Sequence, residues 1–137
     1  MNAPSTNEEQ VQKMLAAYLT GDEDTLRAMI GPEGEIYGDP GIINAGTYHG
    51  FDGFQEWIKH WEEAWDDVDY ELREPIAIGE YFVVLPAHIT GRGAGSGVEI
   101  DSVFGWMYEI RDGRVARFHV YATVERAVEV AERLAGP

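Results

Sequence analysis

The stretch "GVEIDSVFGWMYEIRDGRVARFHVYA", residues 97–122, decides the fold of this chain. Apolar and polar side chains alternate in its two long segments, a pattern typical of strands with one buried face. Asp112-Gly113 joins the segments, and this residue pair favours the tight turn of a hairpin. Because a parallel crossover needs a dozen or more residues, the two segments must pair antiparallel.

Two further segments with this period precede the hairpin, at residues 68–78 and 81–91, and Gly79-Glu80 links them by a compact turn. Segments whose apolar residues repeat with the period of a helix lie before and after these strands. The apolar positions of the first and third expected helices, in that order, are Val11, Met14, Leu15, Tyr18 and Leu19, then Phe54, Trp57, Ile58, Trp61 and Trp65. A short helix within residues 22–31 and a C-terminal helix capped by Thr123 complete the set.

This order of elements predicts one α+β domain over residues 1–137. Three helices in the N-terminal half pack on a curved antiparallel sheet of four to six strands, and a helix closes the chain. A curved sheet covered by aromatic helices tends to leave a cavity, which is the default place to look for a ligand.

Charge and composition exclude several classes of function. Ten Lys and Arg oppose 25 Asp and Glu, and the formal charge of −15 disfavours nucleic acid and anionic membrane partners. The chain has no cysteine, no long apolar run and no signal-peptide pattern, so a cytoplasmic protein is expected. The four histidines lack the spacing of metal ligands, and we expect neither a metal site nor a cofactor.

Several stretches resemble the SnoaL-like group of the nuclear-transport-factor-2-like superfamily, which includes ketosteroid isomerases and polyketide cyclase-like proteins. They are "YGDP", "GTYHGFDGF", "GRGAGSGVEID" and "IRDGRVARFHVYATVERAVEVA". The resemblance implies a cone-shaped α+β barrel, a deep apolar pocket that takes a small apolar molecule, and a homodimer built on the outer sheet face. Because the superfamily hosts isomerases, cyclases, dehydratases and binding modules, the residues must decide the function.

Asp39, directly before Pro40, matches the position of the general base of ketosteroid isomerases. The tyrosine that stabilises the oxyanion in those enzymes is replaced here by Met14, which disfavours steroid isomerisation unless Tyr18, one turn along, substitutes. We expect Asp39 to transfer a proton and Tyr18 or His60 to polarise a substrate oxygen. The alternative is that Asp39, as an aspartate directly before a proline, only initiates a turn and has no catalytic role.

The expected pocket lining consists of apolar and aromatic side chains from the helices and the strands: Met14, Tyr37, Phe54, Trp57, Trp61, Trp106, Tyr108 and Phe118. Along the last strand, Phe118 and Val120 should face the pocket, which turns His119 outward with His88 and Asp101. The first hypothesis is a cofactor-independent isomerase, dehydratase or cyclase acting by proton transfer on an apolar oxygenated metabolite. The alternatives are a non-catalytic ligand-binding module and a protein that acts through its outer sheet face.

Overall fold

A computed structural model describes residues 7–40 and 45–136 of the chain. These residues form four helices and seven strands in the order given next. The elements are α1 (Asn7–Thr20), α2 (Glu23–Met29), β1 (Glu35–Gly38), β2 (Gly46–His49), α3 (Gly50–Glu63), β3 (Trp65–Leu72), β4 (Ile76–Ile78), β5 (Phe82–Gly93), β6 (Glu99–Arg111), β7 (Arg114–Tyr121) and α4 (Val124–Ala135). The α+β class expected from the sequence is therefore confirmed.

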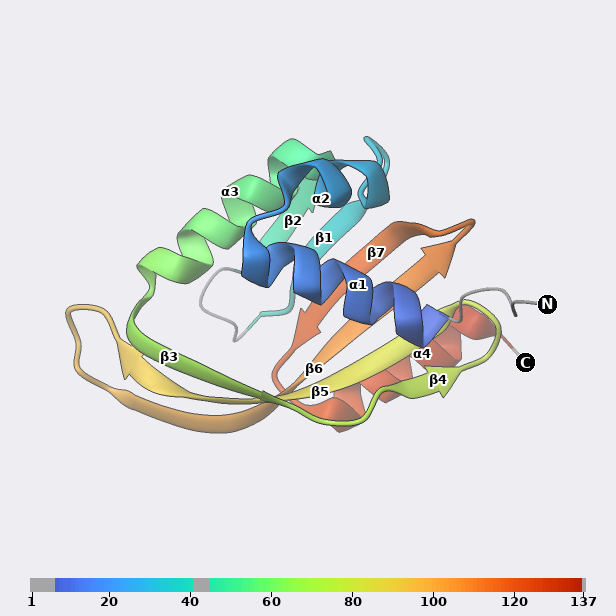
Figure 1. Ribbon diagram of the computed structural model, residues 1–137. Helices are drawn as coiled ribbons and strands as arrows, with labels where there is room; N and C mark the ends of the chain where they lie inside the picture. Colours follow the sequence, from blue (N-terminus) through green and yellow to red (C-terminus); the bar gives the residue numbers. More distant parts are fainter. Residues whose placement is uncertain (1–6, 41–44, 137) are drawn as a thin grey trace.

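The seven strands form one curved, unclosed sheet in the order β2-β1-β7-β6-β5-β3, and β4 pairs with β5 beyond the end of β3 (Figure 1). The antiparallel pairing of β5, β6 and β7 is as expected, and Asp112-Gly113 makes the tight turn between Arg111 and Arg114 with positive φ at both residues. The sheet differs from the expected antiparallel meander at its other edge. There β1 pairs parallel with β7 and antiparallel with β2, so the sheet is mixed.

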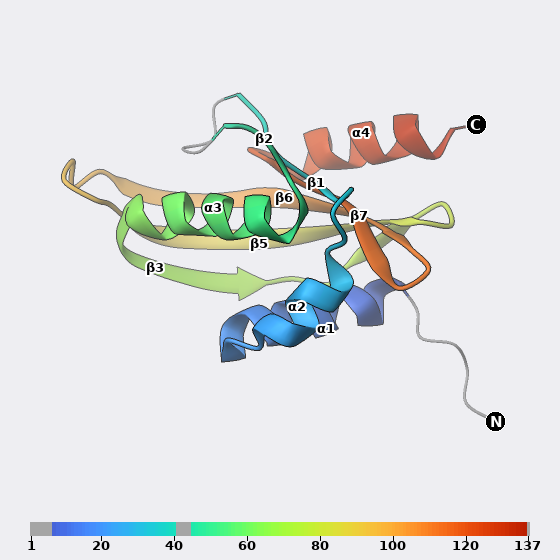
Figure 2. The same cartoon turned by 90° about the horizontal axis from the view of Figure 1, so that it is seen from above.

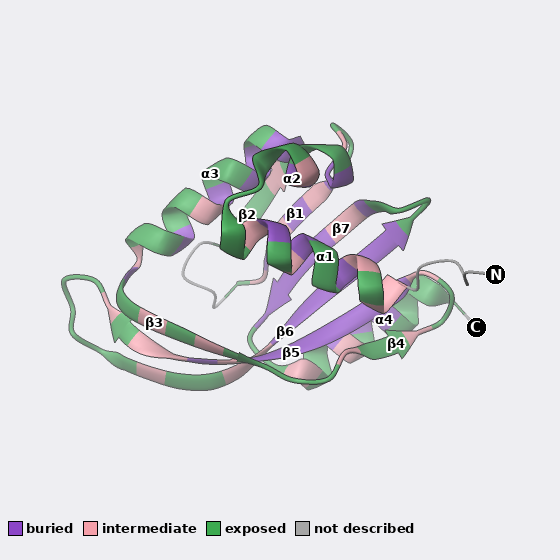
Figure 3. Cartoon of the chain, viewed as in Figure 1, coloured by how far each residue is buried: buried purple, intermediate pink, exposed green. Residues whose placement is uncertain are grey.

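Helices cover both faces of the sheet. Figure 2 shows α1 and α2 on one side of the long strands and α4 on the other. We call the face toward α1, α2 and α3 the inner face and the face toward α4 the outer face. The strands are buried where helices cover them, and the end of the β5–β6 hairpin is exposed (Figure 3).

Alternation along the strands divides the apolar side chains into two layers. Trp106, Tyr108 and Phe118 join the large cluster on the inner face, whereas Met107 and Tyr121 join the smaller cluster under α4. The expected facing of Phe118 and Val120 toward the inner layer and of His119 away from it is confirmed. No helix among the described residues is long and apolar enough to cross a membrane.

The outer layer depends on a close approach between β6 and α4 at Gly105. A Cβ atom at Gly105 would lie 2.7 Å from the backbone oxygen of Thr123 and 2.6 Å from the Cβ of Ala127. Real Cβ atoms do not come so close to backbone oxygens, so any larger residue forces α4 away from the sheet. Thr123 begins this helix by accepting a hydrogen bond from the backbone N–H of Arg126, as the sequence predicts.

We therefore expect Gly105→Ala to lower the free energy of unfolding by about 1–3 kcal/mol, the usual cost of overpacking, as measured by urea denaturation. Gly31→Ala is the matched control, because a Cβ there meets nothing closer than 3.7 Å and the change restricts the unfolded chain. Equal stabilities for the two variants would contradict the close packing of α4.

Candidate functional site

An apolar cavity lies on the inner face of the sheet, between α1, α3 and the long strands. It encloses about 30 Å³, roughly the room for one water molecule. Its lining residues are Met14, Leu15, Tyr18, Phe54, Trp57, Ile58, Trp61, Tyr70, Trp106, Tyr108 and Phe118. Side chains fill most of the space that the fold leaves there.

A larger groove of about 850 Å³ opens directly beside this cavity. It runs between the C-terminal end of α1, α2, α3 and β3. The groove and the cavity share four lining residues: Tyr18, Phe54, Ile58 and Tyr70. The groove is large enough for a drug-sized molecule, and the cavity forms its inner end.

A row of tryptophans forms one wall of this site. The rings of Trp57 and Trp61 stack with centroids 5.6 Å apart, and Trp65 follows 5.4 Å from Trp61. The spacing of Trp57 and Trp61 at i and i+4 on α3 places them on one helix face, while Trp65 opens β3. Trp106 on β6 stands 5.9 Å from the ring of Tyr70, so aromatic faces surround the cavity.

Two tyrosine hydroxyls supply polarity where the groove meets the cavity. The indole N–H of Trp61 donates a hydrogen bond to the hydroxyl oxygen of Tyr70 over 2.6 Å. Tyr18 lies near enough to Tyr70 for the two phenols to influence each other electrostatically. Burial raises the pKa of both phenols above their ordinary value, and the negative charge of Glu62 raises the pKa of Tyr18 further. Both hydroxyls therefore stay protonated near neutral pH and can donate hydrogen bonds.

Two indole N–H groups in this wall are buried without an acceptor among the described residues. They belong to Trp106, which lines the cavity, and Trp65, which lines the groove. A buried donor without a partner is uncommon and costs stability.

The structure brings together most of the expected pocket residues. Seven of the eight expected lining residues line the cavity: Met14, Phe54, Trp57, Trp61, Trp106, Tyr108 and Phe118. Of the three residues expected to act chemically, Tyr18 lies in the cavity wall. Tyr37, Asp39 and His60 are not among the residues that line the cavity or the groove.

Asp39 and Tyr37 lie on the other side of the sheet. Ile36 of β1 is fully buried in the inner layer, so the alternation of the strand turns Tyr37 to the outer face, where it packs with the cluster under α4. The hydroxyl of Tyr37 donates a hydrogen bond to Asp39 Oδ1 over 2.9 Å. This placement corrects the expectation that Asp39 borders the apolar pocket, because the backbone of the sheet separates them.

His60 lies on the exposed side of α3, with Nδ1 3.5 Å from the hydroxyl of Tyr48. The helix period explains this position, because the buried stripe of Trp57 and Trp61 leaves His60 on the flank toward β2. Sequence reasoning missed Tyr70, the partner of Trp61. The signal was present, since Val68, Tyr70 and Leu72 alternate with charged residues along the segment that becomes β3.

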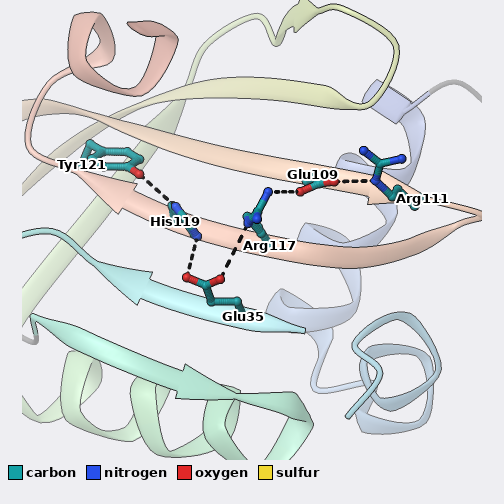
Figure 4. Close-up of polar contacts among 6 residues, drawn as sticks. All are labelled: Glu35, Glu109, Arg111, Arg117, His119 and Tyr121. Atoms are coloured by element: carbon teal, nitrogen blue, oxygen red, sulfur yellow. Dashed lines mark hydrogen bonds and ion pairs between the residues drawn. The ribbon is translucent and has the colours of Figure 1, made fainter. Parts of the chain in front are cut away.

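A polar network, in which Glu109 and His119 are buried, occupies the outer face of β1, β6 and β7 (Figure 4). Glu109, whose exposed fraction is 4%, accepts hydrogen bonds from Arg111 and Arg117, and Arg117 also pairs with Glu35. His119 is 6% exposed, with Nδ1 2.9 Å from the hydroxyl of Tyr121 and Nε2 3.4 Å from Glu35. Paired in this way, the charged groups can remain on a covered sheet face.

The outer face beyond α4 carries His88 and Asp101, as the alternation predicts, and these two side chains lie 2.6 Å apart. A homodimer through this face stays a prediction. Among the described residues, no group of three or more histidine, aspartate or glutamate side chains is arranged to hold a metal ion.

Comparison with known proteins agrees with this fold. The family model of the SnoaL-like domain matches residues 11–118, which is most of the chain. The protein therefore belongs to the SnoaL-like domain family. The chain matches none of the curated proteins by sequence.

Solved structures share the architecture. An NTF2-like protein from Burkholderia xenovorans superposes with a TM-score of 0.77 at 22% identity, covering 95% of this chain and 99% of that one. TerC, co-crystallised with polyporic acid, gives 0.71 at 21% identity, covering 93% and 99%. A protein from Jannaschia, provisionally described as a SnoaL-like polyketide cyclase, gives 0.68 at 17% identity, covering 100% and 99%. At sequence identities of 17% to 22%, these similarities show a shared fold.

His119 should make stability depend on pH. Burial lowers the pKa of His119 below its ordinary value of about 6.5, and the neighbouring Glu35 offsets part of this shift. The unfolded chain then binds a proton more readily than the folded one, so this contribution is present above about pH 6.5 and is lost as the pH falls below it. We expect the free energy of unfolding, measured by urea denaturation between pH 7 and 5, to fall more steeply for the wild type than for His119→Gln.

The substitution Glu35→Gln tests the direction of the shift in the pKa of His119. Without that carboxylate the pKa of His119 falls further, and an NMR titration of the His119 ring should show a lower midpoint than in the wild type. Parallel stability curves for the wild type and His119→Gln would contradict the buried, neutral state of this side chain.

Proposed function

We propose that this protein binds a small, apolar organic molecule that carries an oxygen acceptor, in the groove that ends at the aromatic cavity. The body of the ligand packs against Phe54, Trp65 and the neighbouring apolar side chains. Its oxygen reaches the inner end of the groove, where Tyr18 and Tyr70 meet. Burial of aromatic and apolar surface supplies most of the affinity, and the hydroxyls supply orientation.

The observation that carries this proposal is the hydrogen bond from Trp61 to Tyr70. Because the Tyr70 oxygen accepts the indole proton, its own O–H is free to donate elsewhere. Among the described residues, neither this hydroxyl nor that of Tyr18 donates a hydrogen bond. Two protonated phenols at the entrance of an apolar cavity suit a carbonyl or ether oxygen better than a hydrogen-bond donor.

Binding without reaction fits the site more simply than proton transfer does. The raised pKa of both phenols makes them donors rather than bases, and the cavity lining contains no carboxylate. TerC, which shares the fold, was co-crystallised with polyporic acid, which supports a binding role for this architecture.

A second candidate is a proton-transfer enzyme of the isomerase, dehydratase or cyclase type. One observation favours it: Glu62 lines the groove close enough to Tyr18 to affect the pKa of that phenol. Glu62 would then remove a proton next to a carbonyl group, while Tyr18 and Tyr70 would stabilise the oxygen that gains charge. The provisional description of the Jannaschia relative as a polyketide cyclase points the same way.

We expect Tyr70→Phe to weaken binding of 2-acetylnaphthalene by about 3- to 10-fold, the value of one hydrogen bond to a neutral group. Binding of 2-ethylnaphthalene, which has the same shape without the oxygen, should change less than 2-fold. Both affinities can be measured by isothermal titration calorimetry. Tyr48→Phe is the matched control, because Tyr48 lies on β2 and lines neither the groove nor the cavity.

Equal losses for the two naphthalenes, or no binding of either one, would contradict the proposed role of the groove. Mass spectrometry of the same mixtures separates the two candidate functions. Recovery of unaltered ketone, with no exchange of its α-hydrogens for solvent deuterium, supports binding. Exchange that is catalysed by the wild type and lost in Glu62→Gln supports proton transfer.

A further inference from the structure

We infer that the free edge of β3, which forms one wall of the groove, binds an extended peptide as an additional antiparallel strand. The peptide alternates apolar and basic side chains, and the apolar ones turn into the groove. Peptide binding is a function beyond the proposed small-molecule binding, because it depends on backbone groups of β3 rather than on the tyrosine hydroxyls at the inner end of the groove.

β3 is the last strand on its side of the sheet, and Figure 1 shows it along the border that faces the helices. It pairs with β5 in a regular antiparallel register from Asp67 to Leu72. Val68 and Tyr70 line the groove, so the unpaired edge of the strand borders that space. The edge strand of a sheet offers unpaired backbone N–H and C=O groups to another chain.

The hydrogen-bond pattern identifies the free groups. The backbone N–H of Arg73 donates to the carbonyl oxygen of Pro86 over 3.0 Å, so these two opposed residues form a hydrogen-bonded pair. Hydrogen-bonded and non-hydrogen-bonded pairs alternate along an antiparallel ladder, and residues of the second kind turn their N–H and C=O groups away from the neighbouring strand. In β3 these residues are Val68, Tyr70 and Leu72. Their backbone groups therefore point toward the position of an added strand.

Exposed apolar side chains accompany this edge. Leu19, which lines the groove, is 67% exposed, and Leu72 at the end of β3 is 38% exposed. A strand added next to β3 would place every second side chain on the inner face, level with Val68 and Tyr70. Apolar residues at those positions would pack against Leu19 across the groove and remove its surface from water.

The outer side of β3 determines the charge of the partner. Asp67, Asp69 and Glu71 alternate with the groove-facing residues and are exposed. A second copy of this chain, paired through the same edge, would bring these carboxylates opposite one another, which is destabilising. A peptide with lysine at the outward positions would pair opposite charges across the ladder. Glu71 already has Arg73 at 3.9 Å and His88 at 4.0 Å, so the two aspartates carry most of this selection.

The test uses a capped seven-residue peptide in which valine alternates with lysine and lysine stands at both ends. In the antiparallel pairing the valines face the groove and their N–H and C=O groups point to β3, whereas the lysine N–H groups point to solvent. N-methylation of the three valines should weaken binding, measured by calorimetric titration, by about 10- to 100-fold, the value of two or three hydrogen bonds. N-methylation of the inner lysines is the matched control and should change the affinity by less than about 3-fold.

Two pairs of variants locate the site on the chain. Leu72→Pro removes one outward N–H without removing a bond to β5, whereas Leu72→Ala keeps that N–H. The affinity for the unmethylated peptide should be about 3- to 10-fold lower for the proline variant than for the alanine variant. Asp69→Asn should lower this affinity by about 2- to 5-fold. Glu132→Gln, which removes the same charge from the exposed side of α4, should leave it unchanged.

Amide hydrogen exchange of the wild-type protein gives a measurement that does not depend on the folding of variants. The N–H groups of Val68, Tyr70 and Leu72 should exchange more slowly in the peptide complex, whereas those of Asp69 and Glu71, which point to β5, should change little.

Equal affinities of the three peptides, or no binding of any of them, would overturn strand addition to β3. Protection confined to β2, the strand at the other border of the sheet, would overturn it as well. These outcomes leave the small-molecule proposal standing, because the naphthalene titrations test that proposal separately.

Discussion

The alternation of side chains along β6 and β7 is the constraint on which the rest of the structure depends. Each strand places one set of side chains on the inner face and the next set on the outer face, so a single hairpin belongs to two layers at once. Trp106, Tyr108 and Phe118 build the aromatic cavity, while Met107 and Tyr121 hold α4. A slip of one residue in the register would exchange the two sets and abolish both layers.

The same constraint separates the two polar regions of the molecule. Tyr18 and Tyr70 lie at the end of a groove that reaches the inner layer, whereas Glu35, Glu109, Arg117 and His119 form a network on the outer face. The sheet stands between them. The groove therefore shares none of its lining residues with the polar network of the outer face.

Much of this architecture was predictable because its apolar and polar residues repeat clearly over short stretches of sequence. The Trp57 and Trp61 stripe, the alternation of β7 and the turn at Asp112-Gly113 each involve near neighbours in sequence, and their placement follows the prediction. Strands of four residues carry no comparable signal. The parallel pairing of β1 with β7 joins segments about 80 residues apart, so no local pattern could reveal it.

The position of Asp39 was not predicted correctly because it depends on this long-range strand pairing. Tyr37 and Asp39, two residues apart in the sequence, lie on a common face, where a hydrogen bond joins them. Which face of the sheet this is depends on the register between β1 and β7. The pairing of Ile36 with Phe118 fixes that register and turns Asp39 outward. Tyr70 was overlooked for a different reason: its importance comes from the partner Trp61, which lies on another element.

The most direct test of this account is an NMR titration that follows the indole N–H signals of a ¹⁵N-labelled sample as 2-acetylnaphthalene is added. The signal of Trp106, assigned with Trp106→Phe, should shift and saturate together with that of Trp61, because the ligand reaches the cavity that both rings line. An unchanged Trp106 signal, with backbone N–H shifts in the same spectra confined to His119 and its neighbours on the outer face, would place the ligand on the wrong side of the sheet and contradict the account.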